Sequence, residues 1–126
     1  PSGEAFSRGH WYEPTVLRAH DNRSAIMQEE IFGPVVPWLE VGDFDEALRL
    51  ANDSAYGLSA YLFTRDLSRV MRFNRESAFG ELYINRGAGE LVQGFHSGWK
   101  QSGTGGEDGR HGIDSYLRKK VAYVRG

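Results

Sequence analysis

The chain has 126 residues, of which 40% are hydrophobic and 25% are charged, a composition that argues against disorder and for one globular domain. Its formal net charge of −2 gives no electrostatic reason to expect nucleic acid or an anionic membrane as a partner. It contains no cysteine, which excludes disulfides, thiolate metal sites and a cysteine nucleophile within these residues. No apolar run approaches the roughly 18 residues of a membrane span.

The first third of the sequence is mostly polar. Residues 1 to about 10 are Gly-rich and unlike a signal peptide, and because the chain also lacks an initiator Met we expect it to be a piece of a longer one. "HWYEPTVL" indicates a short strand, which Pro14 places at a sheet edge or entry point. "HDNRSAIMQEE" is turn-like, and "VVPWLEV", residues 35 to 41, is typical of a buried strand.

A helical period begins after this strand. Apolar residues recur at i, i+3, i+4 and i+7 from Phe44 to Ala51, with Asp43 as the N-cap and Glu46 completing a variant of the capping box. "LSAYLF", residues 58 to 63, is nearly all apolar, as in a strand covered on both faces.

A second helix follows, then a third strand. Asp66 can cap this helix, which should stop near Gly80 and whose inner face should be formed by Leu67, Val70 and Met71. "ELYIN", residues 81 to 85, is the strand. The order predicts two linked βαβ units over residues 35 to 85, part of an open, mostly parallel α/β sheet with flanking helices.

The last third begins with a Gly-rich, aperiodic stretch, residues 87 to 112, that is too long for an idle loop. Ile113, Tyr116 and Leu117 then indicate a short helix, and "KKVAYV" indicates a closing strand without an adjacent hairpin partner. We therefore expect a main part, residues 1–112, and a terminal part, residues 113–126, whose strand pairs with another chain or segment.

Two features of the Gly-rich stretch could carry chemistry. "SGTGGEDG", residues 102 to 109, resembles a phosphate loop but lacks the Lys-Ser/Thr of a Walker A loop, so we favour a tight turn with several glycines at positive φ. None of the four histidines has zinc-ligand spacing, and His10, His20 and His111 are expected at the surface or behind a site. His96, between aromatic residues, is either a donor to a small polar ligand or part of a loop packed by its own aromatics.

The stretch "QEEIFGPVV" places Glu29 and Glu30 beside an apolar run. Adjacent residues of an extended segment point to opposite faces, so a two-carboxylate mechanism is not expected. A single carboxylate can accept two hydrogen bonds from a vicinal diol such as a ribose, and Phe32 would lie on the same face. Gly33 would let the backbone approach a ligand, although these residues alone favour a solvated strand entry.

Five segments in register resemble the NAD(P)-dependent aldehyde dehydrogenase superfamily: "WYEPTVL", "MQEEIFGPVV", "ANDSAYGLSAYLFTRDL", "GELYINR" and "GWKQSGTGGEDGRHGIDSYLRKKV". The resemblance runs from about residue 9 to the end and implies the C-terminal part of the catalytic domain of a longer, cytoplasmic enzyme. It implies NAD or NADP as the cofactor, an aldehyde as the substrate, and a nucleophilic Cys and a general-base Glu upstream. The closing strand, residues 119 to 125, is similar to the superfamily's oligomerisation strand and implies a homo-oligomer.

The same resemblance implies roles for four residues. Glu30 and Phe32 would hold the nicotinamide-side ribose. The segment around "QGFHSGW" looks most like lactaldehyde and glycolaldehyde dehydrogenases, which makes Phe95 a wall of the substrate mouth and His96 a contact to the hydroxyl of a small 2-hydroxyaldehyde. No catalytic residue and no metal ligand is expected within the chain. The alternative, from its orphan strand and absent nucleophile, is a non-catalytic α/β module for interaction or oligomerisation.

Overall fold

The computed structural model describes residues 3–126, which divide into two compact units, one up to residue 53 and one from residue 54 onward. The first unit contains η1 (Glu4–Phe6), β1 (Thr15–Arg18), α1 (Ala25–Gln28), β2 (Val35–Trp38) and α2 (Phe44–Asn52). The second contains β3 (Tyr56–Gly57), β4 (Ser59–Leu62), α3 (Leu67–Glu76), β5 (Glu81–Ile84), β6 (His96–Ser97), β7 (Trp99–Lys100), β8 (Gly106–Glu107) and α4 (Gly109–Ser115). The mixed α/β class predicted from the sequence is correct, and the expected boundary near residue 112 stays a prediction.

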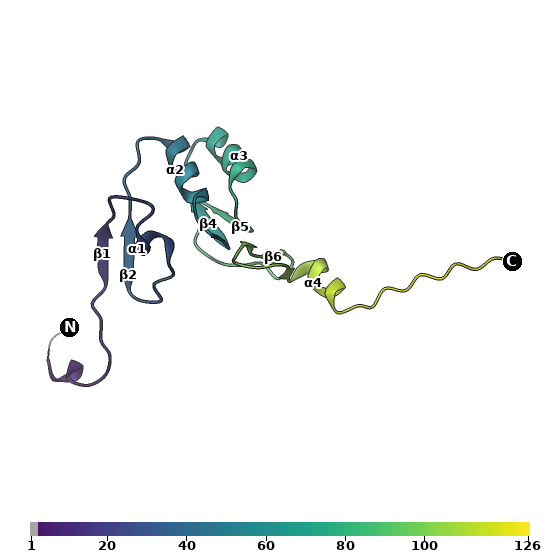
Figure 1. The fold of residues 1–126 in the computed structure, drawn as a ribbon, viewed down its shortest axis with the longest axis horizontal. Helices are drawn as coiled ribbons and strands as arrows, with labels where there is room; N and C mark the ends of the chain where they lie inside the picture. Colours follow the sequence, from purple (N-terminus) through teal and green to yellow (C-terminus); the bar gives the residue numbers. More distant parts are fainter. Residues whose placement is uncertain (1–2) are drawn as a thin grey trace. The chain divides into compact units, whose positions relative to one another are not determined.

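Strands β1 and β2 of the first unit pair in parallel, from Thr15 beside Val35 to Arg18 beside Trp38, and lie side by side in Figure 1. The expectation that residues 35–41 begin two linked βαβ units was wrong, because β2 pairs with β1 and not with a later strand. The one-turn helix α1 connects the two strands, in a segment where the sequence indicated only a turn.

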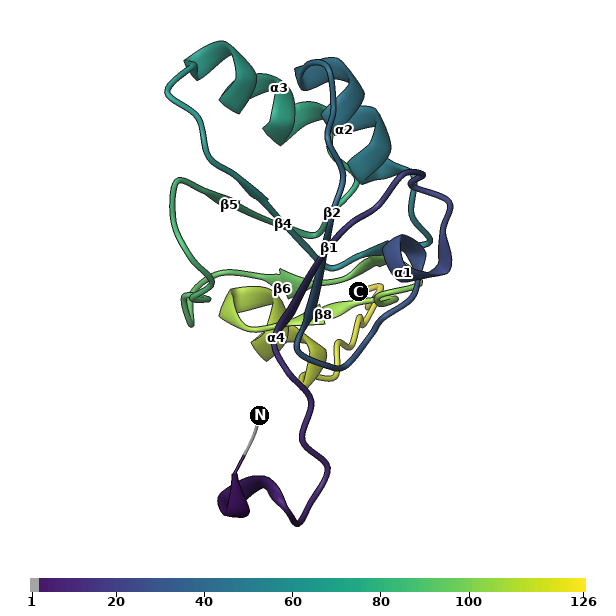
Figure 2. The same ribbon diagram turned by 90° about the vertical axis from the view of Figure 1, so that its left-hand side faces the viewer.

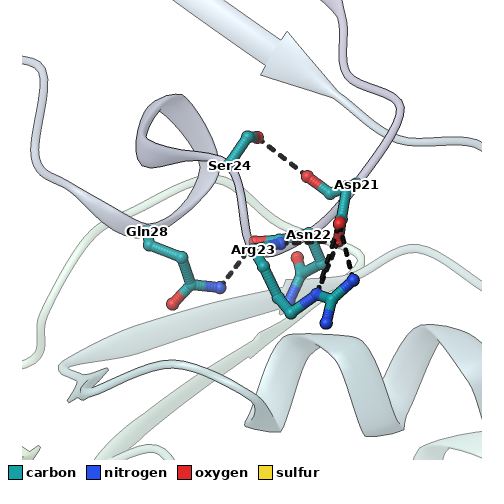
Figure 3. A network of polar contacts seen from close by, with 5 residues as sticks. All are labelled: Asp21, Asn22, Arg23, Ser24 and Gln28. Carbon is teal, nitrogen blue, oxygen red and sulfur yellow. Dashed lines mark hydrogen bonds and ion pairs between the residues drawn. The ribbon is translucent and has the colours of Figure 1, made fainter.

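A polar network joins α1 to the carboxyl end of α2, and Figure 3 shows the side chains of Asn22 and Gln28 that take part in it. The Asn22 side-chain amide donates to the carbonyls of Leu50 and Asp53, each at 3.3 Å. The Gln28 amide donates to the Asn22 carbonyl at 2.7 Å and to the Asp53 carbonyl at 2.9 Å. The Leu50 carbonyl also accepts from the Asp53 backbone amide at 3.1 Å, so Asn22 adds a second bond there, and both side chains bond the Asp53 carbonyl just past the helix end. The polar segment predicted to be a turn therefore also links α1 to the end of α2.

Both predicted caps are correct. The Asp43 carboxylate accepts from the Glu46 amide at 2.8 Å, although the Glu46 carboxylate reaches back to the Gly42 amide and not to Asp43 itself. The Asp66 carboxylate accepts from the amides of Ser68 and Arg69 at the start of α3. Each cap depends on residues within three positions, so sequence spacing alone locates it.

The second unit contains one parallel βαβ element, in which β4 pairs with β5 from Ser59–Glu81 to Leu62–Ile84 and α3 connects them. The inner face of its helix agrees with the expected one only at Val70, which is half-buried. Leu67 and Met71 are 72% and 55% exposed, whereas the buried residue is Phe73. The buried Ser77 hydroxyl donates back to the Phe73 carbonyl at 2.6 Å, one turn earlier, which marks this side of the helix end as the interior.

The Gly-rich stretch takes part in two short antiparallel pairs: its β7 pairs with β3, and its β6 pairs with its β8 (Figure 2 labels the second pair). A Cβ atom on Gly106 would lie 2.3 Å from the His96 carbonyl oxygen and 2.7 Å from the Phe95 ring. Only Gly109, of the glycines in residues 102–109, has a positive φ, at 57°. Our expectation of several left-handed glycines was therefore wrong. Gly106 is required because the His96 backbone lies too close to leave room for a Cβ atom.

Apolar burial is sparse within the described residues. The buried hydrophobic side chains are Ala19, Leu48, Phe73 and Tyr83. The strand β4 was expected to be covered on both faces, yet Tyr61 within it is 46% exposed. Each sheet formed by the described residues has two strands, so its faces are too small to bury many side chains.

Residues 117–126 follow α4 without regular secondary structure and are exposed throughout (Figure 1). Val121, Tyr123 and Val124 are 72%, 96% and 90% exposed. The predicted strand is therefore not formed by this chain alone, as expected of a segment whose backbone groups need an external partner. None of the described helices is both long and apolar enough to cross a membrane.

Candidate functional site

The Glu30 segment joins α1 to β2 in the first unit. Both Glu30 and Phe32 are exposed, and Phe32 is 91% exposed at a φ of 48°. A positive φ is uncommon for any residue with a side chain and for a bulky one indicates strain. The segment is held at both ends, by the Gln28 hydrogen bonds before it and by the Thr15 amide, which donates to the Pro34 carbonyl at 2.8 Å, after it. An aromatic ring is thus held out into solvent on a strained backbone.

Glu30 and Phe32 are expected on one face only if the segment is a regular extended strand, in which side chains alternate between faces. The left-handed conformation of Phe32 ends this alternation of side chains. Gly33 was expected to supply the unusual backbone, but its φ is not positive and an added Cβ would make only ordinary contacts, the nearest at 3.7 Å to Ile31. The strained residue is the aromatic one.

The second group of candidates lies in the second unit, around β6. His96 is half-buried, and its Nδ1 lies 2.9 Å from Oε1 of Glu81 and 3.8 Å from Oε1 of Glu90. The other Glu81 oxygen accepts a hydrogen bond of 3.1 Å from the Tyr83 hydroxyl. Glu81 and Tyr83 alternate along β5, and Tyr83 is buried with its ring stacked on Tyr61 at 5.0 Å. Glu81 of β5 thus contacts His96, which itself comes from the irregular stretch, and Tyr83 contacts Glu81.

This surrounding charge alters two titrations. The Glu81 hydrogen bond and its negative charge raise the pKa of His96 above the ordinary histidine value, and the nearby Glu90 and Glu107 add to the effect. Burial raises the pKa of the Tyr83 hydroxyl, and its bond to Glu81 raises it further. A histidine with this environment stays protonated to a higher pH than a free one, and then both ring nitrogens are donors.

Ligand atoms of Glu81, Glu90 and His96 lie within 4.8 Å of one another, the spacing that a metal ion could bridge. The 2.9 Å contact is, however, an ordinary hydrogen-bonded ion pair, and Tyr83 occupies the second Glu81 oxygen. We therefore assign no metal to this cluster.

Phe95, directly before β6, packs against residues other than those around His96. Its ring lies 5.0 Å from that of His111 in a tilted arrangement and also borders Gly106. His111, expected at the surface or behind a site, is exposed and packs on Phe95. His96 meanwhile borders a surface hollow whose other lining residues include Leu58, Ser102 and Tyr116. Phe95, just before β6, and His96, its first residue, thus have different surroundings, one aromatic and one charged.

The phosphate-loop hypothesis for residues 102–109 gains no support from these contacts. Gly106 and Gly109 face protein backbone at less than 3.0 Å from an added Cβ, so the glycines accommodate the chain itself. The loop also contributes the carboxylates of Glu107 and Asp108, which would repel a phosphate.

Sequence reasoning proposed Phe95 and His96 but missed Glu81 and Tyr83. The sequence places Glu81 fifteen residues before His96, with an irregular stretch between them. The period-2 pattern of "ELYIN" does predict that Glu81 and Tyr83 share a face of their strand, which is the one signal that was available.

Comparison with known proteins gives the chain its family. The model of the aldehyde dehydrogenase family matches residues 2–122. The chain is 50% identical to a 3,6-anhydro-alpha-L-galactose dehydrogenase of Streptomyces coelicolor, over 99% of this chain and 25% of that protein. It is 43% identical to the lactaldehyde dehydrogenase of Escherichia coli, over 94% of this chain and 25% of that protein.

The structures agree with the sequences. A solved 3,6-anhydro-L-galactose dehydrogenase in complex with NAP superimposes with a TM-score of 0.94 at 46% identity, over 99% of this chain and 26% of that one. The chain thus spans about a quarter of the length of the relatives it matches. From the family model and these likenesses, the chain belongs to the aldehyde dehydrogenase family, an oxidoreductase family.

Proposed function

We propose that this chain is the C-terminal part of an enzyme that oxidises a small 2-hydroxyaldehyde to a carboxylate with NAD or NADP. The observation that carries the proposal is the exposed, strained Phe32 beside Glu30, in a chain of this family. Strained residues persist where the surrounding structure holds them and cluster at ligand sites. The bound cofactor would supply a hydride acceptor.

The Glu30 carboxylate suits a ribose. It has two oxygens and about four lone-pair positions, which match the two hydroxyl donors of a vicinal diol. Phe32 offers an exposed ring that would pack against the sugar or its base. Because Gln28 and Thr15 fix the segment on either side, the carboxylate would not have to be ordered when the cofactor binds.

The substrate class follows from His96 and Phe95. The compounds named for two relatives, 3,6-anhydro-L-galactose and lactaldehyde, are aldehydes with a hydroxyl group on the adjacent carbon. A histidine held by a carboxylate can hydrogen-bond such a hydroxyl through Nε2, because Nδ1 is already used by Glu81. Glycolaldehyde and lactaldehyde are the test substrates. The cytoplasmic location stays a prediction.

The cofactor role is tested in the complete enzyme with two neighbouring substitutions. Glu30→Gln removes a charged acceptor and should raise KM for the cofactor and lower the hydride-transfer rate in single-turnover measurements, by about tenfold since hydrogen bonds to charged groups contribute 1.5–3 kcal/mol. Glu29→Gln makes the same change one residue earlier and should leave both within about twofold, the effect usual for surface substitutions. Equal effects of the two substitutions, or none from Glu30→Gln, would contradict the assignment.

The alternative function is an oligomerisation module that acts through residues 119–125. The exposure of Val121, Tyr123 and Val124 favours such pairing but does not conflict with an enzyme, because an enzyme subunit can use the same strand. Incubating the 126-residue chain alone with NAD and glycolaldehyde separates the two readings. We expect no turnover, since a cysteine nucleophile is absent. Turnover would show that the chain carries a catalytic group of its own.

A further inference from the structure

The Glu81 carboxylate has two hydrogen-bond partners on opposite sides. Oε2 accepts from the Tyr83 hydroxyl at 3.1 Å, and Oε1 lies 2.9 Å from Nδ1 of His96. The Glu81 side chain is only 14% exposed and the His96 ring 29%, so solvent screens this pair less than the surface pairs of the chain. The Tyr83 ring, stacked on Tyr61, is the buried end of the series.

We propose that Glu81 is a positioning residue for His96, and that Tyr83 anchors Glu81 in turn. The inference rests on the proposed function, in which His96 contacts the substrate hydroxyl. A carboxylate that accepts the Nδ1 proton fixes the tautomer and the rotation of the imidazole ring. It leaves Nε2 as the free nitrogen, and a hydroxyl group can serve as either its donor or its acceptor.

The need for a positioning residue follows from the origin of His96. The strand β6 has two residues, His96 and Ser97, and it pairs with the equally short β8. The backbone hydrogen bonds of this pair do not set the side-chain torsions of the His96 ring. Glu81 begins β5, which pairs along four residues with β4, so the carboxylate belongs to the better-held element. The orientation of the His96 ring is thus set by Glu81, which lies fifteen residues earlier in the chain.

Three carboxylates face the His96 ring. They come from β5 (Glu81), from the loop after it (Glu90) and from β8 (Glu107). Glu81 alone is within hydrogen-bond distance, since the Nδ1 contact of Glu90 is 3.8 Å. The effect of Glu107 is through its charge only, which makes it a matched control.

The test compares Glu81→Gln with Glu107→Gln in the complete enzyme, using lactaldehyde and its deoxy analogue propionaldehyde. Glu81→Gln should raise KM for lactaldehyde about fivefold, because hydrogen bonds to an ionised group are roughly twice as strong as neutral ones. KM for propionaldehyde should not change. In the profile of lactaldehyde KM against pH, the histidine transition should move to lower pH. Glu107→Gln should move the transition less and leave both KM values within about twofold.

A second pair of substitutions separates this proposal from the proposed function. His96→Asn should remove the preference for lactaldehyde, and Glu81→Gln should add nothing to it. If His96→Asn alters the preference and Glu81→Gln does not, positioning by Glu81 is wrong and the role of His96 stands. If His96→Asn leaves the preference unchanged, the substrate role fails and the inference fails with it. Should Glu81→Gln prevent folding, Tyr83→Phe keeps the ring stack and should still raise the lactaldehyde KM about fourfold, because a hydrogen bond contributes about 1 kcal/mol. A KM within about twofold of the wild type would overturn the anchoring.

Discussion

Replacing Gly106 by alanine should show whether this glycine is needed for close contact between backbone segments or for binding a ligand. An alanine Cβ there would lie 2.3 Å from the His96 carbonyl oxygen, and contacts below 3.0 Å are essentially never formed, so that oxygen has to retreat by about 0.7 Å. The Phe95 ring, at 2.7 Å, blocks the same space. Because β6 and β8 pair through only two residues each, such a shift should break the pair. Overpacking of this kind costs about 1–3 kcal/mol of the free energy of unfolding.

The assay is thermal inactivation and lactaldehyde kinetics of the complete enzyme, with Gly105→Ala as the control. An alanine Cβ at Gly105 meets nothing within 4 Å, so this variant should keep wild-type stability and kinetics. Gly106→Ala should inactivate at lower temperature and lose about tenfold to a hundredfold in kcat/KM, since misplacement on the order of 1 Å can cost a hundredfold. Equal behaviour of the two variants would refute the reasoning from close approach and revive a ligand-binding loop.

Two further predictions concern local structure and assembly. Asp66→Ala should lower the free energy of unfolding of the complete enzyme by about 1 kcal/mol, because α3 loses its N-cap, while Asp66→Asn should be neutral; denaturant titration checks this, and a costly Asn variant would mean that the charge and not the cap matters. Tyr123→Pro should reduce assembly in sedimentation experiments, because proline cannot donate to a strand ladder, while Tyr123→Phe should not. Assembly unchanged by proline would rule out pairing through residues 119–125.

The features that the sequence predicted correctly are local ones. Asp43 and Asp66 cap helices through amides two or three residues away, and the β4–α3–β5 crossover follows from the spacing of two apolar runs. The inner face predicted for α3 was wrong at Leu67 and Met71, though not at Val70, because the period gives only the pattern of a helix. Which side meets the interior depends on what packs there, and here that side carries Phe73 and not Leu67.

The candidate site was predictable in part for the same reason. His96 could be proposed from its aromatic neighbours and its family resemblance, but its partner Glu81 is set by the path of an irregular stretch. The left-handed backbone of Phe32 had no sequence signal either, since the adjacent Gly33 was the residue expected to be unusual. Non-local contacts and strained conformations are decided by the whole fold, not by a window of residues.

The amides of Asn22 and Gln28 that close the end of α2 have a consequence for cofactor affinity (Figure 3). Both are neutral, so neither titrates and neither is weakened by salt. The support beneath Glu30 should accordingly be the same at pH 6 and pH 9 and in dilute or concentrated buffer. Any change of cofactor affinity with salt or pH in this range would then arise elsewhere than in these two amides.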